Sequence, residues 1–237
     1  MVENFDGLLI HIGGMDIQLH TSIINWLMIG LVLCLFFIIV GKKFETADER
    51  KAPKGILLIA EMIVGLCKSI IGDNLKESTR HYIPFFGTLI MMMAVSNLLG
   101  LLGLQPPTSN LSVNVTLALM MFLLIQFTNV KENGLVNRLK QWLDPFPFLA
   151  PLNIIGDCAL PISLSLRLFG NLLAGTIIMG LFYSLLQSVW PFTILGYVVT
   201  PFLHFYFDIF SGLIQTYIFF TLASFFLSEA KASEEEA

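Results

Sequence analysis

The chain has 237 residues, of which 56% are hydrophobic and only 13% are charged, and its formal net charge is −4. Soluble globular domains carry about a quarter charged residues, so this composition excludes an ordinary soluble domain and indicates a membrane protein. The sequence contains no basic patch interleaved with aromatic residues, which argues against nucleic-acid binding. The three cysteines and four histidines show no ligand spacing, so the sequence predicts no metal site and no cofactor.

Apolar runs separated by polar segments predict the elements of the first two thirds of the chain. We expect, in order, an outward-facing N-terminal segment at 1–21, a span at 22–40, a charged loop at 44–54, an interfacial segment at 55–72, a span at 84–104, a turn at 105–110, a span at 112–130 and a polar connection at 131–147. Because Glu61 and Lys68 interrupt the segment at 55–72, we expect it to lie at the interface, and the alternative is that it packs against other helices.

From residue 148 to 228 nearly every residue is apolar, and Pro191 divides this region into two long stretches. Each stretch is about twice the roughly 20 residues that cross a bilayer perpendicularly, so each is either broken into two pieces or strongly tilted. The sequence therefore predicts an all-α integral membrane protein with a single polytopic domain at 1–237. It has five transmembrane helices plus an interfacial helix, and the last two helices form a long tilted hairpin at 148–228.

The placement of Lys and Arg predicts the topology. Of the 13 such residues, eight lie between Lys42 and Arg80, three between Lys131 and Lys140, and one is Lys231. With five spans these twelve fall on one side, which we expect to be cytoplasmic, with the N-terminus outside. The acidic tail at 229–237 is then cytoplasmic and solvated.

The remaining basic residue, Arg167, is the only Lys or Arg in the apolar run 160–182. A guanidinium cannot escape burial by losing its proton, so an intramembrane arginine marks a functional site. The alternative is an arginine that snorkels from a helix end, but apolar sequence extends well beyond Arg167 on both sides.

On a helix, Ser163 and Asn171 share the face of Arg167. Small residues recur on this stripe, which allows close approach of another helix but is also a common packing device. Asp157 lies ten residues before Arg167, about 15 Å away, and is either part of a path or a helix cap. Asn153 lies one turn before Asp157, and Thr176 lies nine residues after Arg167.

A second polar stripe runs along the last apolar stretch. His204, Asp208 and Gly212 are spaced by four, Gln215 follows Asp208 by seven, and Ser211 borders the same face. The alternative to a transport role is a hydrogen-bonded cluster between helices. If the two stretches are antiparallel, Gln215 lies beside Arg167 and the two aspartates lie on opposite sides of it. That pattern predicts two half-paths separated by a fixed positive charge, with the carrier in another protein.

These residues resemble subunit a of F-type ATP synthases. The run SLRLFGN at 165–171, continued by Ala174-Gly175, resembles the family's main motif, and PTSN at 107–110 followed by NVTLAL at 114–119 resembles a second one. The runs SNLLGL at 96–101 and GLIQ at 212–215 also fit. The resemblance covers residues 61–228 in order.

The resemblance implies that Arg167 faces a rotating c-ring whose subunits carry an ion-binding carboxylate. Gln215 matches the family's glutamine opposite the arginine, and Asn171 matches its asparagine one turn on. Thr176 and Asp208 occupy the positions of the outer path, with His204 and Ser211 on the same face as Asp208. Asn153 and Asp157 align with inner-path positions, and Ser163 lies on the arginine's face.

The implied function is a non-catalytic stator subunit of the bacterial plasma membrane that conducts protons or sodium ions. Its implied partners are the c-ring, the peripheral-stalk b subunits and membrane lipids. The alternative function is a self-contained secondary transporter in which Arg167 binds an anionic substrate. That alternative predicts internal repeats and helix breaks around the site, and the sequence shows neither. The chain also lacks a phosphate-binding glycine loop.

Overall fold

The computed structural model describes residues 7–12, 15–45, 53–72, 75, 77–102, 104–144, 146–188 and 192–232. Within these ranges, five helical segments are long and apolar enough to cross a membrane: Thr21–Glu45, Arg80–Leu102, Leu111–Leu143, Pro147–Leu186 and Gly196–Glu229. The predicted all-α membrane architecture is therefore confirmed. Pro191, which was predicted to divide the last two apolar stretches, and most of the acidic tail lie outside the described residues.

A short β-hairpin precedes the helices and was not predicted. Strands β1 (Gly7–Ile12) and β2 (Met15–His20) pair antiparallel, with Gly7 opposite His20 and Ile12 opposite Met15. The pair Gly13-Gly14 between two runs rich in Leu and Ile is a hairpin signal in the sequence.

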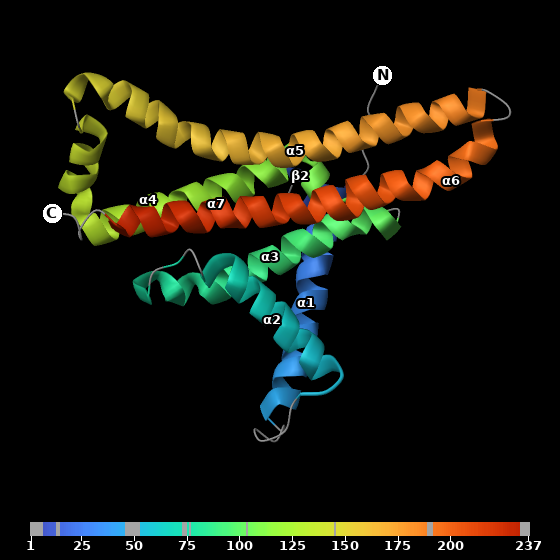
Figure 1. Ribbon diagram of the computed structural model, residues 1–237, viewed down its shortest axis with the longest axis horizontal. Coiled ribbons are helices and arrows are strands. Elements are labelled where there is room, and N and C mark those ends of the chain that lie inside the picture. Colours follow the sequence, from blue (N-terminus) through green and yellow to red (C-terminus); the bar gives the residue numbers. More distant parts are fainter. Residues whose placement is uncertain are drawn as a thin grey trace.

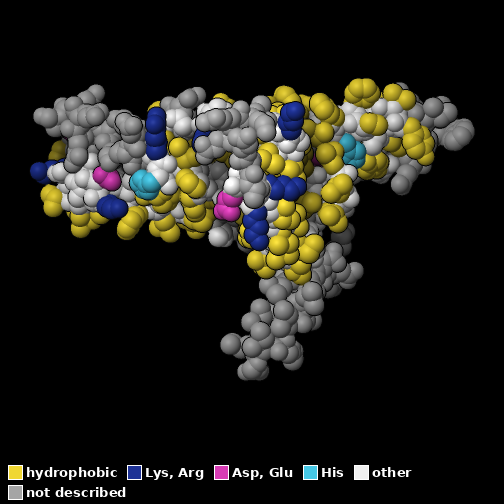
Figure 2. All heavy atoms as spheres, turned by 90° about the horizontal axis from the view of Figure 1, so that it is seen from below, with side chains coloured by type: hydrophobic (Ala, Val, Ile, Leu, Met, Phe, Trp, Pro, Cys, Tyr) yellow, Lys and Arg dark blue, Asp and Glu magenta, His cyan; other side chains and the backbone are white. Residues whose placement is uncertain are grey.

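Helices α1 (Thr21–Glu45) and α2 (Ile56–Gly72) project from the long axis of the molecule (Figure 1). Helix α1 continues past the predicted end at residue 40, and Lys42 and Lys43 in its last turn complement the helix dipole. Large apolar side chains are exposed along both helices, and they also cover much of the body on the face shown in Figure 2. Such extensive apolar exposure is compatible with a lipid environment and not with water.

The core lies where helices α3 (Ile83–Leu98), α4 (Leu111–Leu143) and α7 (Gly212–Ala232) pack together. Phe86 and Phe220 meet edge to face, with ring centroids 6.2 Å apart. Helix α4 begins at a side-chain cap, because Asn110 Oδ1 accepts a hydrogen bond from the Ser112 N–H at 2.9 Å.

The predicted span at 112–130 does not end at residue 130, because α4 continues through most of the polar connection to Leu143, with a break at Gly134. Gly134 has φ 77° and ψ 154°, a conformation that glycine adopts without a steric penalty. Residues 135–143, here called the α4 limb, turn back toward the start of α5 (Figure 1). The limb is helical because its polar side chains find partners on α4 and α5, as described below.

Helix α5 (Ala150–Ser188) is one continuous helix of 39 residues that includes Pro161, so it is about 58 Å long. It runs beside a second continuous unit made of α6 (Phe192–His204), the π-helical segment η5 (Phe205–Ser211) and α7 (Figure 1). Neither stretch is broken in two, and an apolar hydrocarbon layer about 30 Å thick accepts such lengths only at a strong tilt.

A buried polar network fixes where α3 crosses the start of α7. The Asn97 amide donates to the Gly212 carbonyl and to Thr216 Oγ1, both at 3.0 Å, and its Oδ1 accepts from Thr108 Oγ1 at 2.6 Å. Asn114 Nδ2 donates to the Thr108 carbonyl at 2.7 Å. Because these groups are buried, each lost partner leaves an unpaired polar atom that costs about 1–3 kcal/mol.

We expect Gly212→Ala to lower the midpoint of thermal unfolding of the protein purified in detergent. A Cβ at residue 212 would lie 3.0 Å from Asn97 Cβ, and such overpacking costs about 1–3 kcal/mol. Gly180→Ala is the matched control, because a Cβ there meets nothing within 4 Å. Equal midpoints for the two variants would contradict the proposed close crossing.

Candidate functional site

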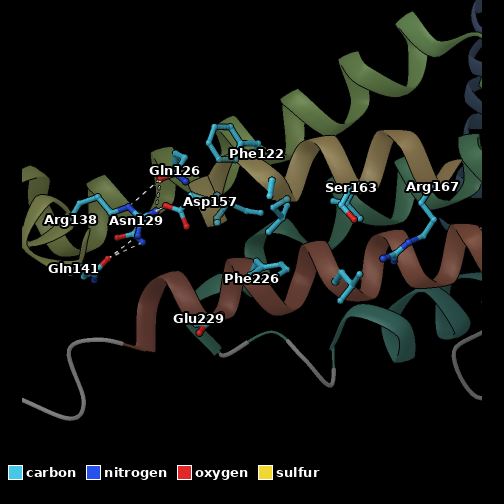
Figure 3. A pocket seen from close by; sticks show the side chains of 16 residues that line it. Phe122, Gln126, Asn129, Arg138, Gln141, Asp157, Ser163, Arg167, Phe226 and Glu229 are labelled. Atoms are coloured by element: carbon cyan, nitrogen blue, oxygen red, sulfur yellow. Dashed lines mark hydrogen bonds and ion pairs between the residues drawn. The ribbon is translucent and has the colours of Figure 1, made fainter. Parts of the chain in front are cut away.

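Arg167 lies on the face of α5 that lines a cavity of about 820 Å³ between α4, α5 and α7. Its side chain is exposed, and it forms no hydrogen bond or ion pair with any residue that the structure describes. Figure 3 shows Arg167 and Ser163 extending from α5 toward α7. Ser163 lines the same cavity, so these two residues share one face as predicted.

One turn beyond Arg167, α5 and α7 are joined by a hydrogen bond between side chains. Asn171 Nδ2 donates to Gln215 Oε1 at 2.8 Å. Gln215 is only 3% exposed, and its Nε2 has no partner among the described residues. Ser211, Asn171 and Gln215 also line a small cavity beside this bond. The structure thus pairs Gln215 with Asn171 next to the arginine.

Toward the C-terminal end of α5 lies the histidine cluster, which consists of Tyr183, His204 and Asp208. His204 Nε2 is 2.7 Å from the Tyr183 hydroxyl, and His204 Nδ1 is 2.6 Å from Asp208 Oδ2. Asp208 belongs to the π-helical segment, a feature frequent at functional sites. A Cβ at Gly100 would lie 3.3 Å from Asp208 Cγ, so a glycine there leaves room for the carboxylate.

Thr176 forms no hydrogen bond with Asp208 in the described part of the chain. The Thr176 side chain is exposed, and its hydroxyl donates to the Leu172 carbonyl one turn earlier at 2.8 Å. This intrahelical bond is the usual one for a threonine in an apolar helix.

Near the start of α5 lies the guanidinium cluster, which consists of Arg138, Trp142 and Asp157. Figure 3 shows two of its members, Arg138 and Asp157, beside the cavity. Asp157 Oδ2 accepts a charge-assisted hydrogen bond from Arg138 Nη2 and a second bond from Trp142 Nε1 at 2.8 Å. Asn153 secures the same junction, because its Nδ2 donates to the Trp142 carbonyl at 2.9 Å and to the Asp144 carbonyl at 3.2 Å.

The two clusters therefore flank Arg167 along α5. Asp157 and Tyr183 are 26 residues apart in one helix, which corresponds to about 39 Å. Arg167 and the Asn171–Gln215 bond lie between them. Asp157 and Asp208 therefore mark two polar regions, and the permanent positive charge of Arg167 lies between them.

Four contributors to this site were missed in the sequence: Gly100, Arg138, Trp142 and Tyr183. Arg138 and Trp142 lie in the segment that we expected to be a polar connection, and no helix was predicted there. The pair Asn133-Gly134 was a signal for a helix break followed by a second helical piece. Tyr183 lies in a largely apolar run with no ionisable side chain near it in sequence, so only the tertiary pairing with His204 identifies it.

The profile of the ATP synthase A chain family matches residues 22–228. Similar proteins include "ATP synthase subunit a 2" of Acaryochloris marina, 33% identical over 91% of this chain and 86% of the relative. "ATP synthase subunit a" of Nitrosospira multiformis is 33% identical over 91% of this chain and 81% of the relative. "ATP synthase subunit a 1" of Chlorobaculum parvum is 31% identical over 93% of this chain and 92% of the relative.

We expect Asn171→Leu to lower the thermal unfolding midpoint in detergent by removing the only described partner of a buried amide. Leaving Gln215 fully unpaired costs about 1–3 kcal/mol. The double variant Asn171→Leu/Gln215→Leu removes both partners and leaves neither amide unpaired. Its decrease in unfolding midpoint should therefore be smaller than the sum of the decreases in the two single variants. Additive losses would show that the two side chains do not interact.

Proposed function

Since the chain belongs to the ATP synthase A chain family, we propose that it is the stator ion-path subunit of a rotary F-type ATP synthase. Family membership supports its place in the ATP synthase complex as a multi-pass membrane protein. The observation that carries the proposal is Arg167, a permanent charge in an apolar helix with no partner among the described residues of its own chain. Such a charge calls for a partner outside the chain.

That partner is the ion-binding carboxylate of a c-ring subunit that faces Arg167. The guanidinium favours the ionised carboxylate, so a carrier passing the arginine gives up its ion. The same charge repels free cations and prevents a leak between the two sides. Arg167 is thus both the barrier and the electrostatic switch, and the chain itself carries out no ATP chemistry.

Two offset half-channels deliver and remove the ion, which is a proton or a sodium ion. The outer half-channel passes the histidine cluster, where Asp208 and His204 lie on the outward side of Arg167. Ser211, three residues after Asp208, and Thr176 on α5 belong to the same half-channel. The inner half-channel is the large cavity lined by Asp157, Ser163 and Arg167. The separation of the two clusters along α5 supports this arrangement. A membrane potential of 100 mV then supplies about 2.3 kcal/mol for each charge that crosses.

The placement of Lys and Arg supports an N-terminus outside and a C-terminus in the cytoplasm of a bacterial cell. The hairpin at 148–228 forms the ion path. The exposed apolar faces of α1 and α2 are surfaces for membrane lipids and for the peripheral-stalk b subunits.

Arg167→Ala should abolish ion-driven ATP synthesis in membrane vesicles while leaving assembly of the complex largely intact, because the switch charge is lost. Arg167→Lys should fail as well, since lysine lacks the planar fork and loses its proton more readily when buried. Lys68→Ala on α2 removes an exposed charge outside the cavity and serves as the control. Coupled synthesis near the wild-type rate in Arg167→Ala vesicles would refute the stator proposal.

Asp208→Asn and Asp157→Asn should each slow transport without uncoupling it, because a neutral amide accepts hydrogen bonds but does not attract a cation. Cysteines placed at 208 and 157 should react with a membrane-impermeant thiol reagent from opposite faces. The background must lack Cys34, Cys67 and Cys158, of which Cys34 and Cys158 are exposed. Reaction of both sites from the same face would rule out two opposed half-channels.

A further inference from the structure

Four charged side chains line the large cavity, and their formal charges cancel. Arg138 on the α4 limb and Arg167 on α5 are positive, while Asp157 on α5 and Glu229 on α7 are negative (Figure 3). The part of α4 before Gly134 contributes the uncharged residues Phe122, Ile125, Gln126 and Asn129 to the lining. A net negative lining would attract cations into a cavity that conducts them toward a fixed arginine. The cancellation of positive and negative charges in this lining therefore requires an explanation.

Arg138 is held in a fixed orientation by hydrogen bonds. Its Nε and Nη2 donate to Gln126 Oε1 at 3.1 and 2.9 Å, and its Nη1 donates to Gln141 Oε1 at 3.0 Å. Nη2 also donates to Asp157, and the side chain is only 13% exposed. A guanidinium this well satisfied is not open to an anionic ligand, so its charge acts on Asp157.

Asp157 presents two different oxygen atoms. Oδ2 accepts hydrogen bonds from Arg138 and Trp142, whereas Oδ1 accepts no hydrogen bond from the described residues. The side chain is 33% exposed, and it lines the cavity. The carboxylate can therefore meet a hydrated cation through Oδ1, while its charge is compensated through Oδ2.

We propose that Arg138 is a positioning residue that compensates the charge of Asp157 and thereby sets the affinity of the cavity for cations. This inference rests on the proposed function of the cavity as the inner half-channel. With both residues present, a cation enters or leaves without being trapped. Loss of Arg138 leaves a net negative cavity that concentrates cations, and loss of Asp157 leaves a net positive cavity that repels them.

The competing explanation is that Arg138 and Asp157 only tether the α4 limb to α5. In that case removal of either residue loosens the same junction, and the two variants change transport in the same direction. The charge explanation requires opposite directions, so the two explanations are separable by experiment.

The test uses the whole ATP synthase in inverted membrane vesicles, where ATP hydrolysis drives uptake from the medium that faces the cavity. The measured quantity is the cation concentration that gives half-maximal uptake, with protons set by the pH of the medium and with added Na⁺ at fixed pH as the two probes. This concentration does not depend on how much complex is assembled. At low ionic strength the expected changes are about threefold or more, and they should shrink at high salt.

We expect Arg138→Gln to lower the half-saturating concentration of the transported cation and Asp157→Asn to raise it. The double variant Arg138→Gln/Asp157→Asn restores the charge balance, so its value should return to within about twofold of the wild type. Arg138→Lys keeps the charge but loses the fork, and it should resemble the wild type rather than Arg138→Gln. Lys140→Gln is the control, since Lys140 is an exposed cation of the same limb outside the cavity lining.

The inference would be overturned if Arg138→Gln and Asp157→Asn changed the half-saturating cation concentration in the same direction. It would also be overturned if the double variant did not return this concentration to near the wild-type value. A result in which Arg138→Lys behaves like Arg138→Gln would assign Arg138 to tethering alone. Failure of the proposed function looks different, because ATP-driven uptake would then persist in Arg167→Ala vesicles or be absent from the wild type.

Discussion

The structure depends on the cost of keeping a permanent charge in an apolar helix. Arg167 cannot be neutralised by deprotonation, and no described residue of its own chain pairs with it. The surrounding helices therefore have to hold the arginine at a surface where an outside group can reach it. The long continuous α5, the buried Asn171–Gln215 bond and the Asn97 network all serve to fix that surface relative to α7.

The two clusters that flank the arginine differ in chemistry. The histidine cluster joins a phenol, an imidazole and a carboxylate through hydrogen bonds, so each of its side chains is bonded to a group that can itself carry a proton. The guanidinium cluster pairs a carboxylate with a group that never titrates in this range. The carboxylate of one cluster is thus bonded to an imidazole, while the carboxylate of the other is bonded to a guanidinium.

Much of the fold followed from the sequence because apolar runs and their charged boundaries are strong signals. The spacing of Ser163, Arg167 and Asn171, and of His204 and Asp208, correctly placed these residues on shared helical faces. Helical periodicity, however, reports only neighbours along one helix. Contacts such as Arg138 with Asp157 or Tyr183 with His204 depend on how separate helices pack, and the α4 limb was missed because a polar segment can fold when its partners lie on another helix.

The tight crossing at Gly212 has a mechanical consequence for the proposed motor. A rotor that turns against α5 loads the hairpin sideways, and a stator that yields would waste part of each step as elastic deformation. At the crossing, the Asn97 side chain lies against a residue that has no side chain of its own, and its amide is bonded to the Gly212 carbonyl at 3.0 Å. Such close-packed, hydrogen-bonded interiors deform little. If the chain is the stator of a rotary motor, this junction transmits the lateral load with little lag, and any elastic deformation resides in other parts of the assembly.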